Sequence, residues 1–75
     1  MSWVLVDRRG GCAVWDDTIS DTKRECWDKA YPEVADALGN DWAVKYWKRW
    51  DASVRSAAKL GLTMERAYVA LEPKP

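Results

Sequence analysis

The chain has 75 residues, 12 of them basic and 12 acidic, and no histidine, so its formal net charge at pH 7 is zero. A neutral chain lacks the overall field that draws a protein to nucleic acid or to an anionic membrane. The absence of histidine removes the commonest general base and metal ligand. The length predicts a single domain over residues 1–75, and such a small domain needs large buried side chains, for which six Trp and three Tyr are available.

The N-terminal segment predicts a β-hairpin. Residues 2–7 are aromatic and β-branched, and residues 12–15 resume the apolar pattern after the turn formers Gly10 and Gly11. Glycine tolerates the positive φ that a tight hairpin turn requires. We therefore expect two short antiparallel strands at the start of the fold.

The segment after the hairpin predicts a helix that is broken near its middle. Thr22 and Glu25 match a capping box, and the apolar positions that follow recur at intervals of three and four. Pro32 disfavours helical angles at the residue before it. We therefore expect a kink near Tyr31 and an end at Gly39, because glycine commonly terminates helices.

The clearest pattern covers residues 41–60 and predicts one long amphipathic helix. Its apolar side chains alternate at spacings of four and three, as one helix face requires. These side chains are Ala43, Trp47, Trp50, Val54 and Ala57. We therefore expect Trp47 and Trp50 to lie in the core.

The last predicted element is a strand. Residues 66–72 alternate apolar and polar side chains, which favours an edge strand, with a helix beginning at Thr63 as the alternative. The element order is then ββααβ and the fold class α+β. In this arrangement the hairpin and the C-terminal strand form a small antiparallel sheet, packed on one long amphipathic helix and a shorter broken helix.

No group of residues in the chain predicts catalysis. Cys12 and Cys26 have no histidine to activate them, and without an export signal they predict free thiols. Asp16 and Asp17 are adjacent, which is typical of turn and capping residues before a helix. We therefore expect a protein that is not an enzyme and that has no metal site and no cofactor.

The charges are segregated along the chain. Residues 16–41 carry eight acidic and three basic side chains, and residues 42–75 carry seven basic and three acidic ones. Four of the acids have helical spacing and predict a row on one helix face, which could contact a protein partner or serve only solubility. This row comprises Asp17, Asp21, Glu25 and Asp28.

Two further groups on the predicted helix over 41–60 are candidate binding residues. Trp42 and Tyr46 lie at the margin of the apolar stripe, towards Arg49, and aromatic residues beside Arg are typical of protein contacts as well as of partly buried rims. The cations of the opposite face could instead hold nucleic-acid phosphates, or be a solvated surface. They are Lys45, Lys48, Arg49, Arg55 and Lys59.

The order of segments carries a resemblance. Residues 3–7 read Trp-Val-Leu-Val-Asp, residues 17–27 read Asp-Thr-Ile-Ser-Asp-Thr-Lys-Arg-Glu-Cys-Trp, and a Trp-rich basic helix and a final strand follow. In this order the chain resembles the small orphan accessory proteins of tailed bacteriophages and prophages. The resemblance implies binding and blocking of a host protein or protein complex, as anti-CRISPR and other anti-defence inhibitors do. A nucleic-acid-binding module and a virion assembly component are the alternatives.

The sequence also predicts the location and the oligomeric state of the protein. No apolar run in the sequence is long enough to span a bilayer, and the N-terminus lacks the features of a signal peptide. We therefore expect a monomer or homodimer in the cytoplasm of the host cell, without a membrane partner.

Overall fold

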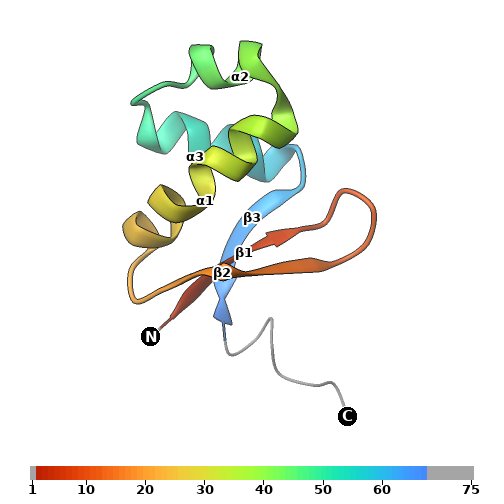
Figure 1. The fold of residues 1–75 in the computed structure, drawn as a ribbon, viewed down its shortest axis with the longest axis vertical. Helices are drawn as coiled ribbons and strands as arrows, with labels where there is room; N and C mark the ends of the chain where they lie inside the picture. Colours follow the sequence, from red (N-terminus) through yellow and green to blue (C-terminus); the bar gives the residue numbers. More distant parts are fainter. Residues whose placement is uncertain (1, 68–75) are drawn as a thin grey trace.

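The computed structural model describes residues 2–67, which form a three-stranded antiparallel sheet and three helices. The elements in chain order are β1 (Trp3–Asp7), β2 (Ala13–Ser20), α1 (Lys23–Leu38), α2 (Asn40–Lys45), α3 (Trp50–Lys59) and β3 (Leu62–Arg66). The sheet order is β2-β1-β3, so the hairpin and the C-terminal strand share one sheet (Figure 1). The predicted α+β class is confirmed.

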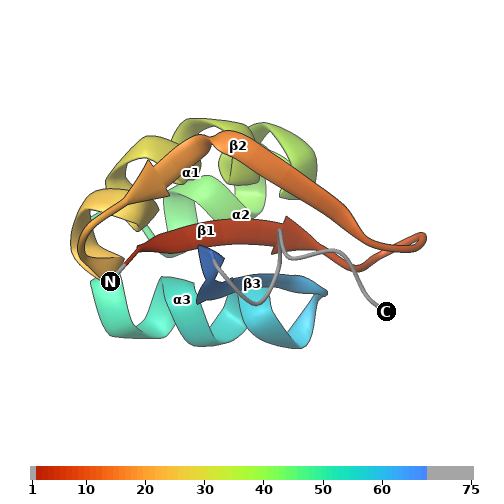
Figure 2. The same ribbon diagram turned by 90° about the horizontal axis from the view of Figure 1, so that it is seen from below.

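The helices lie on one face of this sheet (Figure 2). α1 packs on β1 and β2, α3 packs on β3, and α2 lies on α1 at the side away from the sheet (Figure 1). Val4 and Val6 alternate with Leu5 along β1, so they lie on the opposite face, where they form a second cluster with Ala67. The main core between sheet and helices consists of Leu5, Trp27, Ala30, Val34, Trp42, Ala57 and Leu62.

β2 is longer than the strand predicted over residues 12–15, and it is irregular. Trp3 pairs with Ser20 but Leu5 pairs with Trp15, so residues 16–19 bulge out of the ladder opposite a single position of β1. Bulges of this kind leave backbone groups unpaired and therefore need another hydrogen-bond partner.

Thr18 supplies that partner. Its side chain is fully buried, its Oγ1 accepts the Leu5 N–H at 2.9 Å, and the same hydroxyl donates to the Trp15 carbonyl at 2.7 Å. The hydroxyl thus replaces a backbone partner in the middle of the sheet.

α1 is continuous from Lys23 to Leu38, so the break predicted near Tyr31 is absent. Pro32 lies inside the helix. Pro32 and Asp28, whose carbonyl the proline cannot bond, are both exposed, so water can take the place of the missing donor.

The predicted ends of this helix are confirmed. Thr22 is the N-cap, and its Oγ1 accepts the Glu25 N–H at 3.1 Å. Gly39 follows the last residue with a φ of 99°, and its N–H donates to the Ala35 carbonyl at 2.9 Å. The glycine is needed here because other residues are strained at a positive φ.

The single helix predicted over 41–60 is wrong, because the chain turns at residues 46–49 between α2 and α3. Lys48 has a left-handed backbone with a φ of 61°, which an α-helix cannot contain. The turn lets α3 fold back towards α2, and Trp42 becomes buried with its Nε1 bonded to Ser56 of α3. The burial of this indole explains why the broken arrangement prevails over a straight helix.

A C-terminal strand is present, but β3 lies earlier than the strand predicted over 66–72. Residues 68–72 of that prediction lie outside the described residues. A helix beginning at Thr63 is excluded, since Thr63 pairs with Val6 in the sheet. Gly61 precedes the strand with a φ of 97°, and a Cβ there would meet Arg9 Cγ at 2.9 Å, so only glycine fits.

The buried hydroxyl of Thr18 generates a stability prediction. Thr18→Val keeps the shape of the side chain but leaves the Leu5 N–H without a partner, so we expect the free energy of unfolding to fall by about 1–3 kcal/mol. Urea unfolding followed by Trp fluorescence measures the change. Thr63→Val, which removes a partly buried hydroxyl bonded to Glu65 in the same sheet, is the control and should lose less. Equal losses would show that the bulge does not depend on the Thr18 hydroxyl.

Candidate functional site

A groove lies between α1 and the turn that joins α2 to α3. Its volume is about 490 Å³, within the range of roughly 300–1,000 Å³ that is typical of ligand pockets. Aromatic rings form much of its surface, and charged side chains surround them. The lining residues are Arg24, Trp27, Asp28, Tyr31, Pro32, Trp47, Lys48, Arg49, Trp50 and Ser53.

One face of α1 supplies the first wall. Arg24 is three and four residues before Trp27 and Asp28, and Tyr31 is four and three residues after them, which places all four on the same side of the helix. Trp27 is only 3% exposed, so it is part of the core as well as of the wall. Its ring meets the Tyr31 ring edge to face, with the centroids 6.2 Å apart.

Ser53 of α3 ties this wall to the other side of the groove. Its Oγ accepts the Trp27 Nε1–H at 3.1 Å and donates to the Trp50 carbonyl at 2.8 Å. The serine is 1% exposed, and buried hydrogen bonds of this kind hold rings in one orientation. One hydroxyl therefore links α1 to the start of α3.

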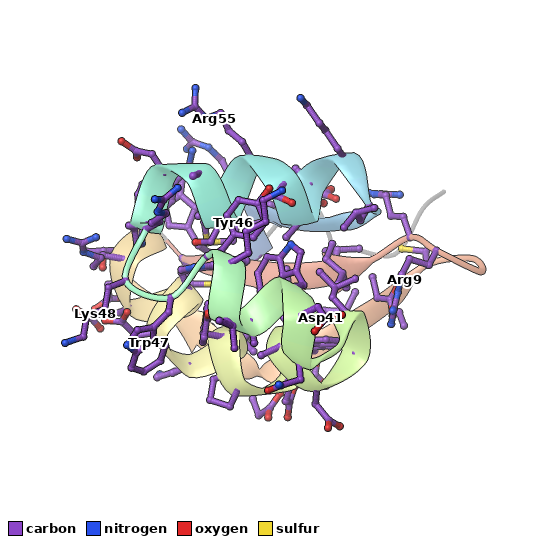
Figure 3. All side chains as sticks on the ribbon, turned by 90° about the horizontal axis from the view of Figure 1, so that it is seen from above. Arg9, Asp41, Tyr46, Trp47, Lys48 and Arg55 are labelled. Carbon is purple, nitrogen blue, oxygen red and sulfur yellow. The ribbon has the colours of Figure 1, made fainter. Side chains whose placement is uncertain are left out.

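Trp47 stands at the rim of the groove. It is 62% exposed, and its ring contacts Tyr31 with a centroid distance of 6.1 Å. The neighbouring Lys48 places its Nζ 6.0 Å from the centre of the Trp47 ring. Figure 3 shows Trp47 and Lys48 side by side at one end of the molecule, both directed outwards.

Trp50 and Arg24 form the opposite rim. The Arg24 guanidinium lies 5.1 Å from the centre of the Trp50 ring, a cation–π arrangement. The Trp50 Nε1 is buried and has no hydrogen-bond partner among residues 2–67. A buried donor without a partner costs about 1–3 kcal/mol. The packing of the Trp50 ring has to outweigh this cost.

The charge of the groove is positive. Arg24, Lys48 and Arg49 are exposed cations that line it, and Asp28 is its one carboxylate. Aromatic walls have a low dielectric, which strengthens the attraction between these cations and an incoming anion. The arrangement can therefore hold an apolar group and a negatively charged group at the same time.

The acidic row predicted on one helix face is not present as such. Asp17 lies in the bulge of β2 and Asp21 in the turn before α1, whereas Glu25 and Asp28 lie on α1 itself. The reason is that β2 continues to Ser20, so the helix begins later than a row starting at residue 17 requires. Of the four acids, only Asp28 lines the groove.

Asp17 meets another acid instead. The hydrogen bond to Asp17, together with some loss of solvation and the charge of Asp17, raises the pKa of the exposed Glu33 carboxyl. The bulge of β2 therefore brings together two carboxyl groups that are far apart in the sequence.

Two tryptophans differ in burial from what the helix pattern indicated. Trp42, expected at the margin of the apolar stripe as either a contact residue or a partly buried rim residue, is 8% exposed, and its Nε1 donates to Ser56 Oγ at 2.9 Å. Trp47, expected in the core, is exposed. The cause is the turn at Lys48, and the sequence Tyr-Trp-Lys at residues 46–48 contains none of the Gly, Pro, Asn or Asp residues that would have indicated it.

The remaining residues of the predicted aromatic and Arg margin are divided. Tyr46 is partly buried and packs on the Trp42 ring at a centroid distance of 5.2 Å. Arg49 is exposed and lines the groove. Trp42 and Arg49 therefore do not share a surface, and Trp47 takes the place beside Arg49 that the sequence assigned to Trp42.

The five cations predicted on one helix face are also separated by the turn. Lys48 lies at one end of the molecule and Arg55 projects from the far side of α3 (Figure 3). Lys45 places its Nζ 5.6 Å from the centre of the Tyr46 ring. Lys59 lies in the last turn of α3, outside the groove. A continuous basic stripe along one helix is therefore wrong.

Other candidate sites of the described region are less complete. Both cysteines are free, with Cys12 exposed in the hairpin connection and Cys26 buried in α1, where burial raises the pKa of the thiol. Within residues 2–67 no cluster of three His, Cys, Asp or Glu side chains could hold a metal ion. No helix of the same region is long and apolar enough to cross a membrane.

Comparisons with protein-family models, with curated proteins and with solved structures found no match for the chain.

The pair of Asp17 and Glu33 predicts a dependence of stability on pH. Because the pKa of Glu33 is raised in the folded state, the folded protein binds more protons than the unfolded chain just above the ordinary pKa of glutamate. The contribution of Glu33 to the free energy of unfolding is therefore present at low pH, and it is lost as the pH rises through the raised pKa of Glu33. We expect Glu33→Gln, which cannot ionise, to gain stability relative to the parent protein as the pH rises from the ordinary pKa of glutamate through the raised pKa of Glu33.

Urea unfolding at several pH values measures this difference. Asp36→Asn, which removes one exposed carboxylate of the same helix outside the pair, controls for the loss of one charge. A difference between Glu33→Gln and the parent that stays constant with pH would contradict the raised pKa of Glu33.

The left-handed turn predicts opposite effects for two substitutions of Lys48. Lys48→Gly should keep the free energy of unfolding or raise it by up to about 1 kcal/mol, because glycine adopts a positive φ without a clash. Lys48→Ile should lower it by about 1–2 kcal/mol, since a β-branched residue is strained there. Both remove the same charge, so thermal or urea unfolding separates the backbone effect from electrostatics. Equal stability of the two variants would argue against the turn.

Proposed function

We propose that the chain is a non-catalytic binding protein of the phage or prophage type, which inhibits a host protein complex, such as a CRISPR or other defence system, through protein–protein contact. The groove between α1 and the α2–α3 turn is its contact surface. Its rim residues Trp47 and Arg49 are the principal anchors.

The exposure of Trp47 carries this proposal. Burying such a ring removes roughly 150–250 Å² from water, which corresponds to about 4–6 kcal/mol. A domain this small depends on its large side chains, yet this one is 62% exposed. Trp, Tyr and Arg are the residue types enriched in the energetic centres of protein interfaces, and here they lie together around one groove.

The chemistry of the chain supports binding over catalysis. The sequence contains no histidine. The groove contains one carboxylate, Asp28, and therefore lacks the second acid of an acid–base pair. Burial raises the pKa of the Cys26 thiol, which disfavours the thiolate form that nucleophilic attack requires.

The inhibitory role and the phage origin are supported by the resemblance in segment order. The alternatives of a virion assembly component and of a nucleic-acid module that uses Lys45, Lys48, Arg49, Arg55 and Lys59 stay predictions. The separation of those five cations by the turn weighs against the nucleic-acid module. Band-shift assays at low salt and the protein content of purified particles distinguish these alternatives.

The proposed function predicts a loss of inhibition when Trp47 is removed. The chain is expressed in bacterial strains that each carry one active defence system, and the plating efficiency of a targeted phage is measured. We expect plating to rise with the parent chain in at least one strain and the chain to purify with a component of that system. Trp47→Ala should weaken this complex about tenfold or more.

Val44→Ala is the matched control. Val44 is also exposed and apolar, and it does not line the groove, so its truncation should leave plating and affinity unchanged. Failure of the parent chain to protect phage in any strain would overturn the inhibitory role. Equal effects of the two substitutions would exclude the groove as the contact surface.

A further inference from the structure

We infer that the groove recognises a short acidic segment of a partner protein. One large apolar side chain of that segment lies against Trp27 and Trp47, and flanking carboxylates pair with the cations of the rim. The inference rests on the proposed function, because it names the part of the partner that the contact surface holds.

The size of the groove favours a short segment. A volume of about 490 Å³ suits a drug-sized group, which corresponds to a few side chains rather than to a folded surface. The wall that α1 supplies is fixed in place, since the Trp27 Nε1–H donates to Ser53 Oγ at 3.1 Å. An apolar side chain can therefore enter a preformed site, which reduces the entropy lost on binding.

The charge of the rim favours carboxylates. Arg24 and Arg49 present guanidinium groups, which bind carboxylates through two parallel hydrogen bonds, and Lys48 adds a third cation. Neither Arg49 nor Lys48 has an acidic partner among the ion pairs found within residues 2–67, which join Arg8 to Glu65 and Arg9 to Asp7. These cations are available to an incoming anion.

The surroundings of the groove disfavour a nucleic acid. Asp28 lines the groove itself, and Asp51 lines the hollow next to Trp50. A nucleic-acid strand carries a phosphate at every nucleotide and extends beyond a small site, so it would meet these carboxylates. A short acidic segment places its charges only where the cations are.

Selection from a displayed library of random peptides about a dozen residues long tests the inference. The purified parent chain is the bait, and the enriched peptides are then synthesised and titrated by isothermal calorimetry. We expect them to combine several Asp or Glu residues with one large apolar residue. Their affinity should fall about tenfold or more with Trp47→Ala and with Arg49→Glu.

Two control variants match these substitutions. Lys59→Glu makes the same charge reversal on α3 outside the groove, and Val44→Ala truncates an exposed apolar residue outside it. Both should bind the peptides as the parent does. Oligothymidylate is titrated in parallel as a nucleic-acid probe and should show no binding that depends on Trp47.

Each other outcome overturns the inference. It fails if no peptide is enriched, if the enriched peptides are not acidic, or if the control variants lose as much affinity as the groove variants. Binding of oligothymidylate that is stronger than that of the peptides and depends on Trp47 would assign the groove to nucleic acid. Inhibition of a defence system with non-acidic peptides would leave the proposed function standing, and acidic peptides without inhibition would remove that function alone.

Discussion

The backbone of Lys48 is left-handed, with a φ of 61°, so the chain reverses between α2 and α3 instead of continuing as one helix. Because of this reversal α3 folds back towards α2, Trp42 is buried with its indole bonded to Ser56, and Trp47 stays exposed. A straight helix would have kept Trp47 on the apolar stripe and left no turn to face α1. The groove therefore depends on one residue whose conformation costs about 1–2 kcal/mol.

Two serine hydroxyls of α3 hold the helices in this arrangement. Ser53 accepts the indole N–H of Trp27 from α1, and Ser56 accepts that of Trp42 from α2. They are three residues apart and so lie on the same side of α3. Small side chains at these positions let large rings approach closely while their polar atoms are satisfied. The same contacts that stabilise the core thus orient the walls of the groove.

The acidic and basic segments of the sequence do not become two opposing faces. The bulge held by Thr18 places Asp17 beside Glu33, and the turn at Lys48 directs some cations into the groove and others to the far side of α3. Charge segregation along a chain is therefore a poor guide to charge segregation in space when strands and helices are interrupted. In the folded protein the positive charge is concentrated locally, in the few cations around the aromatic rings of the groove.

The sequence by itself determined the α+β class, the N-terminal hairpin, and the Thr22 and Gly39 ends of the first helix, because these follow from periodicity and from local capping chemistry. Tertiary packing, by contrast, decides whether a predicted helix runs on or is interrupted along its length. The continuity of α1 through Pro32 depends on an exposed surface, and the turn at Lys48 depends on burying Trp42, which no neighbour in sequence indicates. The residues of the proposed contact surface are of the kind that the sequence singled out, an aromatic residue beside Arg, but only the packing shows that Trp47 is the indole that stays exposed.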